Sequence, residues 1–320
     1  MAGKFRHPSR GGEWRRVGPP RPLGTGLATA RKFVHHAPEF WNRYSQQRMR
    51  EVQPAPVSPR WQDWPDTGVH AAWIGHSTVL LKIDGTVLIT DPVFSERCGL
   101  RVGPVTIGLK RLVEPALRIP HLPHVDVILL SHAHMDHFDL PSLRALHNRG
   151  TTVVTAHATS DLLRVRRYGA VHELGWGEHL RVGPLTFTGL QVRHWGARMR
   201  TDTWRGYNGY LIEAGRRRIV FGGDTADTRD FTAVRTSRPV DLAIMPIGAY
   251  NPWIHAHCTP EQAMRMCNEA GAEHLLPVHH QTFQLGREPS TEPIERFLEA
   301  AGAHTDRVLA RSIGDQGSVM

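Results

Sequence analysis

The sequence predicts an α/β protein of the α+β kind, in which two β-sheets are covered by helices. Strand-like apolar runs meander at both ends of the chain, and helical patterns lie between and after them. With 320 residues, of which 40% are hydrophobic, the chain can bury a substantial core. We therefore expect one large domain built on two helix-covered sheets.

Ten short apolar runs predict the strands of these sheets. They are residues 69–74, 78–83, 86–90, 126–130, 151–155, 185–192, 209–213, 218–221, 241–245 and 275–278. Helical patterns occupy residues 140–148, 159–168, 260–270 and 292–301. In the third helix Pro260 is expected at the first helical position and Thr259 at the N-cap, since the first helical N–H needs no partner inside the helix.

The excess positive charge lies entirely in the first sixty residues. Residues 1–60 contain twelve Lys and Arg against three Asp and Glu, a net charge of +9, whereas residues 61–320 contain 27 of each. We predict a basic, partly flexible N-terminal extension over residues 1–60 and one folded domain over residues 61–320. A charge asymmetry of this kind indicates an anionic partner.

Three roles remain open for the basic extension. It is a solvated N-terminal segment that also packs on the domain, or it contacts nucleic acid, or it contacts an anionic phospholipid surface. At such a surface each Lys or Arg contributes on the order of 1 kcal/mol. Residues 33–50 look helical and amphipathic, and residues 53–59, with three prolines, are typical of a linker.

Membrane insertion and export are not expected. The sequence has no run of about 18 apolar residues that would predict a transmembrane helix, and residues 1–30 lack the apolar region of a secretory signal. Cys98, Cys258 and Cys267 are odd in number and far apart, which favours reduced thiols over a disulfide framework. The expected location is the cytoplasm, with peripheral contact to a membrane through the basic extension.

The densest chemical signal is the segment Ser-His-Ala-His-Met-Asp-His at residues 131–137, which directly follows an apolar run. Its three histidines and its aspartate are ligand types that divalent first-row metals prefer. A loop after a buried strand can turn His132 and His134 to one side and Asp136 and His137 to the other. This arrangement suits two adjacent metals better than one.

Further candidate ligands follow other apolar runs. They are His194, Asp224 and His279. A single histidine is more often a core or surface residue, but here the same context recurs three times after the dense motif. Because a sheet can direct several loop residues at one cleft, we expect the whole set to form one site.

These residues resemble the H-x-H-x-D-H signature of the metallo-β-lactamase superfamily. Other segments resemble the branch that contains the N-acylphosphatidylethanolamine-hydrolysing phospholipase D and the ascorbate-6-phosphate lactonase-like proteins. They are residues 73–77, 90–95, 246–250, 257–261 and 279–283, so that the resemblance covers roughly residues 70–290. It implies a four-layer αββα sandwich of the metallo-β-lactamase type, with the metals at one edge of the two sheets.

The resemblance also implies a role for each candidate ligand. The first metal would be held by His132, His134 and His194. The second metal would be held by Asp136, His137 and His279, with His279 favoured over the adjacent His280. Asp224 would bridge both metals. Two divalent metal ions are expected. Zinc is the preferred identity, although the same ligands suit manganese and iron(II).

Several neighbours of these ligands have open roles. Asp91 either accepts a hydrogen bond from a ligand imidazole and orients it, or simply ends a strand. His76 is expected in a supporting role and not as a ligand. His257 joins Asp136 and Asp224 as a candidate catalytic residue, because it could protonate a leaving group or bind a phosphate oxygen.

Two further groups of side chains lie close in sequence to the candidate ligands. Arg198, Arg200 and Arg205 follow His194, and they either attract a phosphate or form a solvated basic loop. The aromatic residues either line the substrate cleft or pack in the core; they are Trp195, Tyr250 and Trp253.

The sequence favours a metal-dependent hydrolase in which a hydroxide between two metals attacks an ester-type bond. The preferred substrate is a phosphodiester of the N-acylphosphatidylethanolamine type, and the partner is therefore a phospholipid or another small molecule. One alternative is a lactonase or other carbonyl-ester hydrolase. Another is a nuclease-like or nucleic-acid-binding protein, which the zero net charge of residues 61–320 disfavours.

Overall fold

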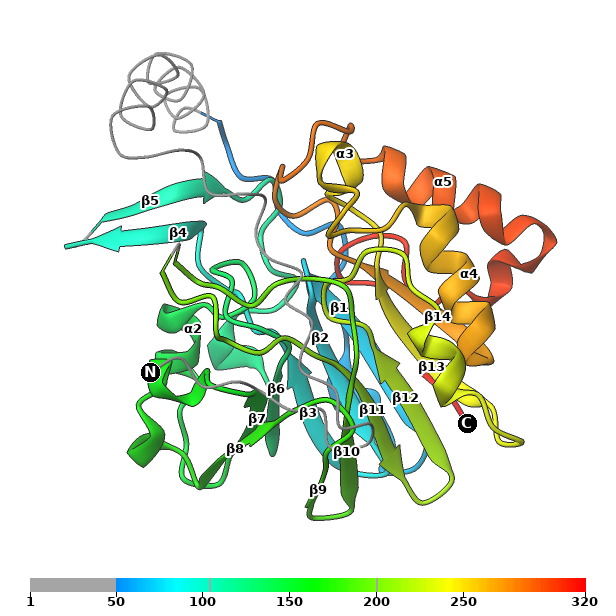
Figure 1. Cartoon of the computed structure of the whole chain (residues 1–320), viewed down its shortest axis with the longest axis horizontal. Coiled ribbons are helices and arrows are strands. Elements are labelled where there is room, and N and C mark those ends of the chain that lie inside the picture. Colours follow the sequence, from blue (N-terminus) through cyan, green and yellow to red (C-terminus); the bar gives the residue numbers. More distant parts are fainter. Residues whose placement is uncertain (1–49, 104, 200) are drawn as a thin grey trace.

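The computed structural model of the protein describes residues 50–103, 105–199 and 201–320. Its two larger sheets pack face to face, and helices cover their outer faces (Figure 1). The α/β class and the predicted four-layer αββα sandwich are therefore confirmed. The expected basic extension lies outside the described residues except for residues 50–60, so that the division at residue 60 stays a prediction.

The first sheet has seven strands. They are β1 (Val69–Gly75), β2 (Thr78–Ile83), β3 (Thr86–Thr90), β6 (Val127–Leu130), β7 (Thr152–Ala156), β8 (Ala170–Leu174) and β15 (Gln316–Val319). Their order across the sheet is β15-β1-β2-β3-β6-β7-β8. Strands β3, β6, β7 and β8 are parallel to one another, and the other neighbours in this sheet are antiparallel.

The second sheet has six strands. They are β9 (His179–Val182), β10 (Leu185–Leu190), β11 (Gly209–Ala214), β12 (Arg217–Phe221), β13 (Val240–Pro246) and β14 (Ala272–Val278). Their order is β14-β13-β12-β11-β10-β9, and β12, β13 and β14 are parallel. A separate hairpin consists of β4 (Arg97–Val102) and β5 (Val105–Lys110).

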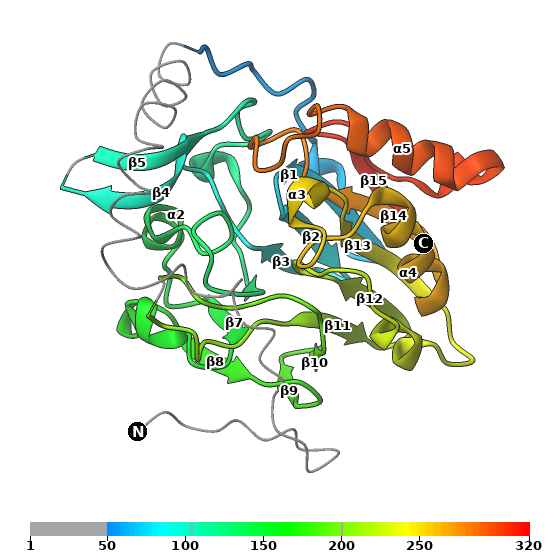
Figure 2. The same cartoon turned by 45° about the horizontal axis from the view of Figure 1, so that its top comes forward.

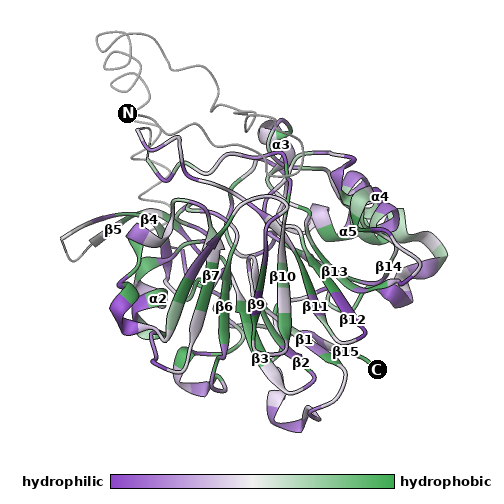
Figure 3. Ribbon diagram, turned by 60° about the horizontal axis from the view of Figure 1, so that its bottom comes forward, coloured by the Kyte–Doolittle hydropathy of each residue, from purple (hydrophilic) through white to green (hydrophobic). Residues whose placement is uncertain are grey.

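The main core lies between the two sheets. Trp73 and Leu129 of the first sheet belong to the same buried cluster as Phe187, Phe221 and Ile244 of the second. Strand β6 reads Val-Ile-Leu-Leu and is buried at all four positions, as expected for a parallel strand that is covered on both faces. Figure 3 shows the hydrophobic residues that run along the strands of both sheets.

Helices supply the two outer layers. Helix α2 (Leu140–Ala145) packs Leu143 onto Ile128 and Val153 of the first sheet. Helices α4 (Pro260–Ala270) and α5 (Glu292–Ala301) cover the second sheet. Helix α4 begins as predicted, since Pro260 stands in its first turn and the Thr259 side chain accepts a hydrogen bond from the Gln262 backbone in a capping box. A short helix α3 (Tyr250–Trp253) precedes α4.

The predicted helix over residues 159–168 is wrong. Two 3-10 turns stand there instead, Ser160–Leu162 and Val165–Arg167. The Glu173 carboxylate accepts hydrogen bonds from three successive backbone N–H groups at residues 158–160, at 2.8–3.0 Å, and fixes the first turn. Arg164 between the turns has φ −85° and ψ 71°, outside the helical region. Three arginines within four residues also disfavour a continuous helix.

The parallel strands bring the candidate ligands to one edge of the sandwich. Asp91 follows β3, the segment 131–137 follows β6, Asp224 follows β12 and His279 follows β14. The carboxyl ends of parallel strands in one sheet lie at the same edge. The fold therefore gathers residues that lie far apart in the sequence.

The three cysteines are buried free thiols, as expected. Within residues 50–320, apart from the two positions that are not described, no helix is long and apolar enough to cross a membrane.

Candidate metal centre

Sharp turns direct three of the site residues. His76, Asp91 and His279 have φ angles of 54°, 31° and 66°, a region that costs energy for residues other than glycine. Hydrogen bonds stabilise the turns: the His76 carbonyl accepts from the His279 backbone N–H at 3.0 Å and from Trp73 Nε1 at 2.8 Å. Strain of this kind often persists at functional sites, where the surrounding structure stabilises it.

The first ligand group consists of His132, His134, His194 and Asp224, whose ligand atoms all lie within 4.8 Å of one another. The Nδ1 atom of His134 lies 2.8 Å from His132 Nε2 and 3.2 Å from His194 Nε2. The Oδ2 atom of Asp224 lies 3.9 Å from His132 Nε2 and 3.7 Å from His194 Nε2. Three ring nitrogens and one carboxylate oxygen thus converge on one point.

The second ligand group consists of Asp136, His137 and His279, whose ligand atoms lie within 4.8 Å of one another and of a ring nitrogen of His76. Asp224 borders this group too, since its Oδ2 atom lies 3.1 Å from His137 Nε2 and 3.2 Å from His279 Nε2. Asp136 Oδ2 lies 3.8 Å from each of the same two nitrogens. Asp224 therefore stands between the two groups, where a bridging ligand would be needed.

The residues fit divalent cations. Within the described part of the chain, His137 Nε2, His279 Nε2 and Asp224 Oδ1 are buried and make no hydrogen bond. Each buried polar atom left in this state costs about 1–3 kcal/mol, so that an ion which they coordinate removes a substantial penalty. Imidazole nitrogens and carboxylate oxygens together are the donors that zinc, manganese and iron(II) accept.

Outer partners orient the ligands. The Nδ1 atom of His137 lies 2.7 Å from Asp91 Oδ2, and Asp91 also accepts from the backbone N–H of Ser131 at 2.7 Å. His194 Nδ1 lies 2.9 Å from the Ala256 carbonyl. Such bonds leave Nε2 free to bind a metal and hold the ring in place. Asp91 therefore does more than end a strand, because it accepts a hydrogen bond from the His137 ring and orients it.

The two groups differ in the protonation of their rings. Burial lowers the pKa of His134 to about 4 and that of His194 to about 3, so that both rings are neutral at pH 7, as metal ligation requires. Burial also opposes a charge on His279, but the carboxylates of Asp224 and Asp136 outweigh it and raise the pKa of His279 to about 9. In the second group the negative charges of the carboxylates thus favour the protonated form of the His279 ring.

Two further histidines, His257 and His280, lie beside the ligand groups. His257 is buried beside the site, with its ring 5.1 Å from those of His194 and His279 and its Nδ1 atom 3.9 Å from Asp224 Oδ2. The His280 ring lies against Trp73, with centroids 4.4 Å apart and planes tilted by 31°, and His280 belongs to neither ligand group.

His76 comes closer to the site than the sequence predicts. Its Nε2 atom lies 3.2 Å from Asp136 Oδ2, and its ring lies 4.3 Å from that of His279. Sequence reasoning placed it outside the ligand set, because a single histidine after a glycine has no spacing signal. Its position directly after the apolar run of β1, like that of the other site residues after their own runs, was the signal available.

The arginines after His194 serve the protein's own structure. Arg198 Nη1 donates to the carbonyls of Ala133 and Phe138 at 3.0 and 2.8 Å, and so braces the metal-binding loop. Arg205 pairs with Asp161 and Asp202 at 2.5 and 2.7 Å. Neither forms a solvated basic loop or a free phosphate site, and Arg200 lies outside the described residues.

The three aromatic residues close in sequence to the candidate ligands have different surroundings. Trp195 lies 4.4 Å from the His194 ring and 4.7 Å from the His134 ring, and so forms a wall of the first ligand group. Tyr250 is buried and donates to Glu292 at 2.7 Å. Trp253 is 40% exposed and belongs to neither the core nor the ligand groups.

Comparisons with known proteins agree with this geometry. A family model described as the Beta-lactamase superfamily domain matches residues 86–280. An uncharacterized protein of Mycobacterium tuberculosis is 35% identical over 264 residues, which cover 79% of this chain and 69% of that protein. The resemblance predicted from the motif is therefore confirmed.

Two further comparisons extend this result. The N-acyl-phosphatidylethanolamine-hydrolyzing phospholipase D 1 of Caenorhabditis elegans is 30% identical over 259 residues, which cover 75% of this chain and 72% of that protein. Among solved structures, the metallo hydrolase Igni18 of Ignicoccus hospitalis has a TM-score of 0.59 at 18% identity and covers 79% of this chain and 99% of that one. The structural likeness shows a shared fold.

Proposed function

We propose that this chain, which belongs to the beta-lactamase superfamily of metal-dependent hydrolases, binds two divalent ions and hydrolyses a phosphodiester as a phospholipase D does. Zinc is the metal that we propose for both positions. One observation carries the two-metal part of the proposal. Asp224 Oδ2 lies 3.7 and 3.9 Å from ring nitrogens of the first ligand group and 3.1 and 3.2 Å from those of the second. A single carboxylate thus serves both groups.

Two such ions, when bound, lower the pKa of water to about 7, which makes hydroxide available, and they stabilise negative charge on phosphoryl oxygens. The chain's own residues supply the geometry. Asp224 sets the separation of the two groups, Asp91 and the Ala256 carbonyl hold the rings of His137 and His194, and Asp136 completes the second group. These fixed positions reduce the reorganisation that the reaction requires.

His257 is assigned to the substrate. Burial lowers its pKa well below the usual range, although the Asp224 carboxylate opposes the shift, and the ring is therefore neutral at pH 7. A neutral imidazole donates one hydrogen bond but has no extra proton to give. Of its two open roles we therefore favour binding of a phosphate oxygen over protonation of the leaving group.

The substrate class rests on the relatives. The Caenorhabditis elegans relative is an N-acyl-phosphatidylethanolamine-hydrolyzing phospholipase D. The mitochondrial N-acyl-phosphatidylethanolamine-hydrolyzing phospholipase D of Saccharomyces cerevisiae is 28% identical over 263 residues, which cover 77% of this chain and 55% of that protein. We propose the same class of substrate, a phospholipid with a phosphodiester, for this chain. A cytoplasmic location, with peripheral contact to a membrane, belongs to the same proposal.

The test combines metal content per chain with hydrolysis of bis-p-nitrophenyl phosphate, on wild type and on Asp224→Ala. Close to two metals in the wild type and loss of both metal and activity in the variant would support the proposal. Asp227→Ala is the matched control, because Asp227 lies three residues further along and pairs with Arg265 instead of the ligands. It is expected to retain both metals.

Two other outcomes redirect the proposal. Two metals without phosphodiester hydrolysis would point to lactones and other carbonyl esters, which the same hydroxide could attack. Protein purified without chelator and free of metal would contradict the metal centre itself.

A further inference from the structure

Six large apolar side chains are exposed on three loops around the metal centre. Each is 40–47% exposed, and they are Leu100, Ile107, Met199, Trp204, Trp253 and Ile254. We call this set the apolar rim. Apolar side chains that gather on one part of a protein surface commonly mark a site of interaction, and the bases of the segments that carry these six all contact the metal centre.

The first loop of the rim is the hairpin β4–β5. Both views show it projecting from the sandwich at the end where α3 also lies (Figures 1 and 2). Leu100 and Ile107 face each other across its two strands. At its base Cys98 packs on Phe283, whose ring lies 5.2 Å from that of His76. The hairpin thus stands beside the second ligand group.

The other two loops are tied to the first ligand group. Met199 and Trp204 follow His194, and Arg198 fastens their loop to the carbonyls of Ala133 and Phe138. Trp253 and Ile254 belong to a run of five exposed residues, 251–255. Two residues after Ile254, the Ala256 carbonyl accepts the hydrogen bond of His194. All three loops therefore present apolar side chains outward while their bases contact the site.

The basic segment, residues 1–49, directly precedes Arg50, and Arg50 contacts the base of the hairpin β4–β5. Arg50 donates to the Lys110 carbonyl at 2.7 Å, and Lys110 Nζ donates to the Arg50 carbonyl at 2.7 Å. Lys110 is the last residue of β5, at the base of the hairpin. Residues 1–49, which precede Arg50, contain ten Lys and Arg against two Asp and Glu, a net charge of +8.

We propose that the apolar rim docks the protein on an anionic phospholipid bilayer, with the basic segment attracted to the same surface. Tryptophan favours the membrane interface, and apolar side chains that enter it leave water. Each Lys or Arg near anionic headgroups contributes on the order of 1 kcal/mol. The inference rests on the proposed function, because a phospholipid substrate would reach the metal centre from that bilayer.

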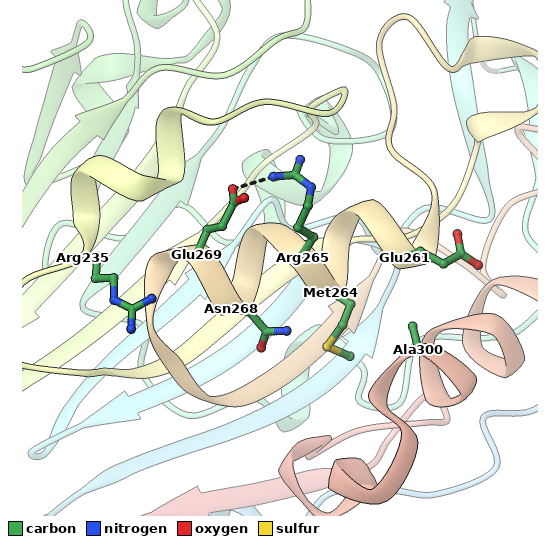
Figure 4. Close-up of a pocket in the computed structure, with 7 residues that line it drawn as sticks. All are labelled: Arg235, Glu261, Met264, Arg265, Asn268, Glu269 and Ala300. Carbon is green, nitrogen blue, oxygen red and sulfur yellow. Dashed lines mark ion pairs between the residues drawn. The ribbon is translucent and has the colours of Figure 1, made fainter.

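A second surface on the protein lacks these properties. The groove along α4, next to α5, is lined largely by charged side chains (Figure 4). Arg265 pairs there with Glu269 at 2.5 Å, and Glu261 pairs with Arg296 at 2.8 Å. Two arginines and two glutamates line it, so that the groove offers no net charge to a membrane.

The experiment is sedimentation of the full chain with vesicles of phosphatidylcholine and phosphatidylglycerol that contain no N-acylated lipid. We expect the wild type to bind, and the double variant Trp204→Ser, Trp253→Ser to bind at least about tenfold more weakly, which corresponds to about 1.4 kcal/mol. Added salt should weaken binding, since it screens the basic segment. Val165→Ser is the matched control, because Val165 is 45% exposed but lies in a turn next to β8.

Each other result has a definite meaning. If the wild type does not bind vesicles, or if the double variant binds as tightly as the wild type, the rim is not the docking surface. If the wild type is instead a dimer that the double variant makes monomeric, without vesicle binding, a second copy covers the rim and the proposal is overturned.

Hydrolysis of the soluble substrate bis-p-nitrophenyl phosphate separates docking from chemistry. We expect equal rates for the wild type, the double variant and Val165→Ser. Rim-dependent vesicle binding in a protein that does not hydrolyse this phosphodiester would preserve the docking surface while the proposed reaction fails.

Discussion

The two ligand groups of the metal centre share Asp224 but are built differently. In the first group burial keeps His134 and His194 neutral, with pKa values of about 4 and 3. In the second group carboxylates outweigh burial and raise the pKa of His279 to about 9. The rings of the first group are thus already neutral, as binding of a cation requires. Binding in the second group depends instead on carboxylates that other side chains must keep in position.

The outer partners follow the same division. His194 of the first group is held by a backbone carbonyl, which is neutral and set by the fold. In the second group Asp91 holds His137, and His76 lies 3.2 Å from Asp136. His132 of the first group bonds to the Ser131 hydroxyl at 2.8 Å, and that hydroxyl donates to Asp91. The comparison teaches that Asp91 and His76 contact the second group directly and the first group at most through Ser131, so that their substitution should weaken the second metal more than the first.

The largest effect is expected from removing one direct ligand of each group. His194→Ala should lose the first metal and His279→Ala the second, each with a fall in kcat/KM of more than about a hundredfold, because even outer partners are worth 10–100-fold. Metal content and bis-p-nitrophenyl phosphate hydrolysis measure both. If either variant lost both metals, the two groups would be one cooperative unit and the comparison would break.

A smaller effect is expected from Asp91→Asn. The amide cannot accept the His137 bond and both Ser131 bonds as the carboxylate does, so that the His137 ring loses its fixed orientation. We expect about a hundredfold weaker binding of the second metal and a smaller effect on the first, which Asp91 reaches only through the Ser131 hydroxyl that bonds to His132. Titration calorimetry with Zn²⁺ into chelator-treated protein resolves the two events. Equal weakening of both would show that Asp91 supports the whole edge of the sheet.

The smallest effect is expected from His76. His76→Phe removes the contact with Asp136 but retains an aromatic ring beside His279, and we expect about tenfold weaker second-metal binding. His76→Gln, which can still donate to Asp136, should recover part of the loss.

The control for His76 is His70→Gln, since His70 is equally buried but bonds to Ser318 and Thr67 away from the site. Thermal unfolding of the metal-free proteins should change little among these variants. A loss of stability in His76→Phe with unchanged metal affinity would assign His76 a purely structural role.

Much of the sandwich was predictable because its strands are apolar and continuous. All ten predicted runs are strands, since core strands must be hydrophobic wherever both faces are covered. The strands that pattern analysis missed lack this signal. The hairpin β4–β5 pairs only with itself, with Gly99 opposite Gly108, and β15 reads Gln-Gly-Ser-Val at an edge. Such strands form because of neighbours that sequence periodicity does not contain.

The sequence by itself determined which residues could bind metal, because the segment 131–137 places four candidate ligands on one loop and the others follow apolar runs. Only the tertiary structure decided how they are held. His76 and Asp136 are 60 residues apart in the chain, and Asp91 and His137 are 46 apart. These pairs meet because strands β1, β3 and β6 end at one edge of the sandwich, and no local pattern of residues encodes which strand ends become neighbours.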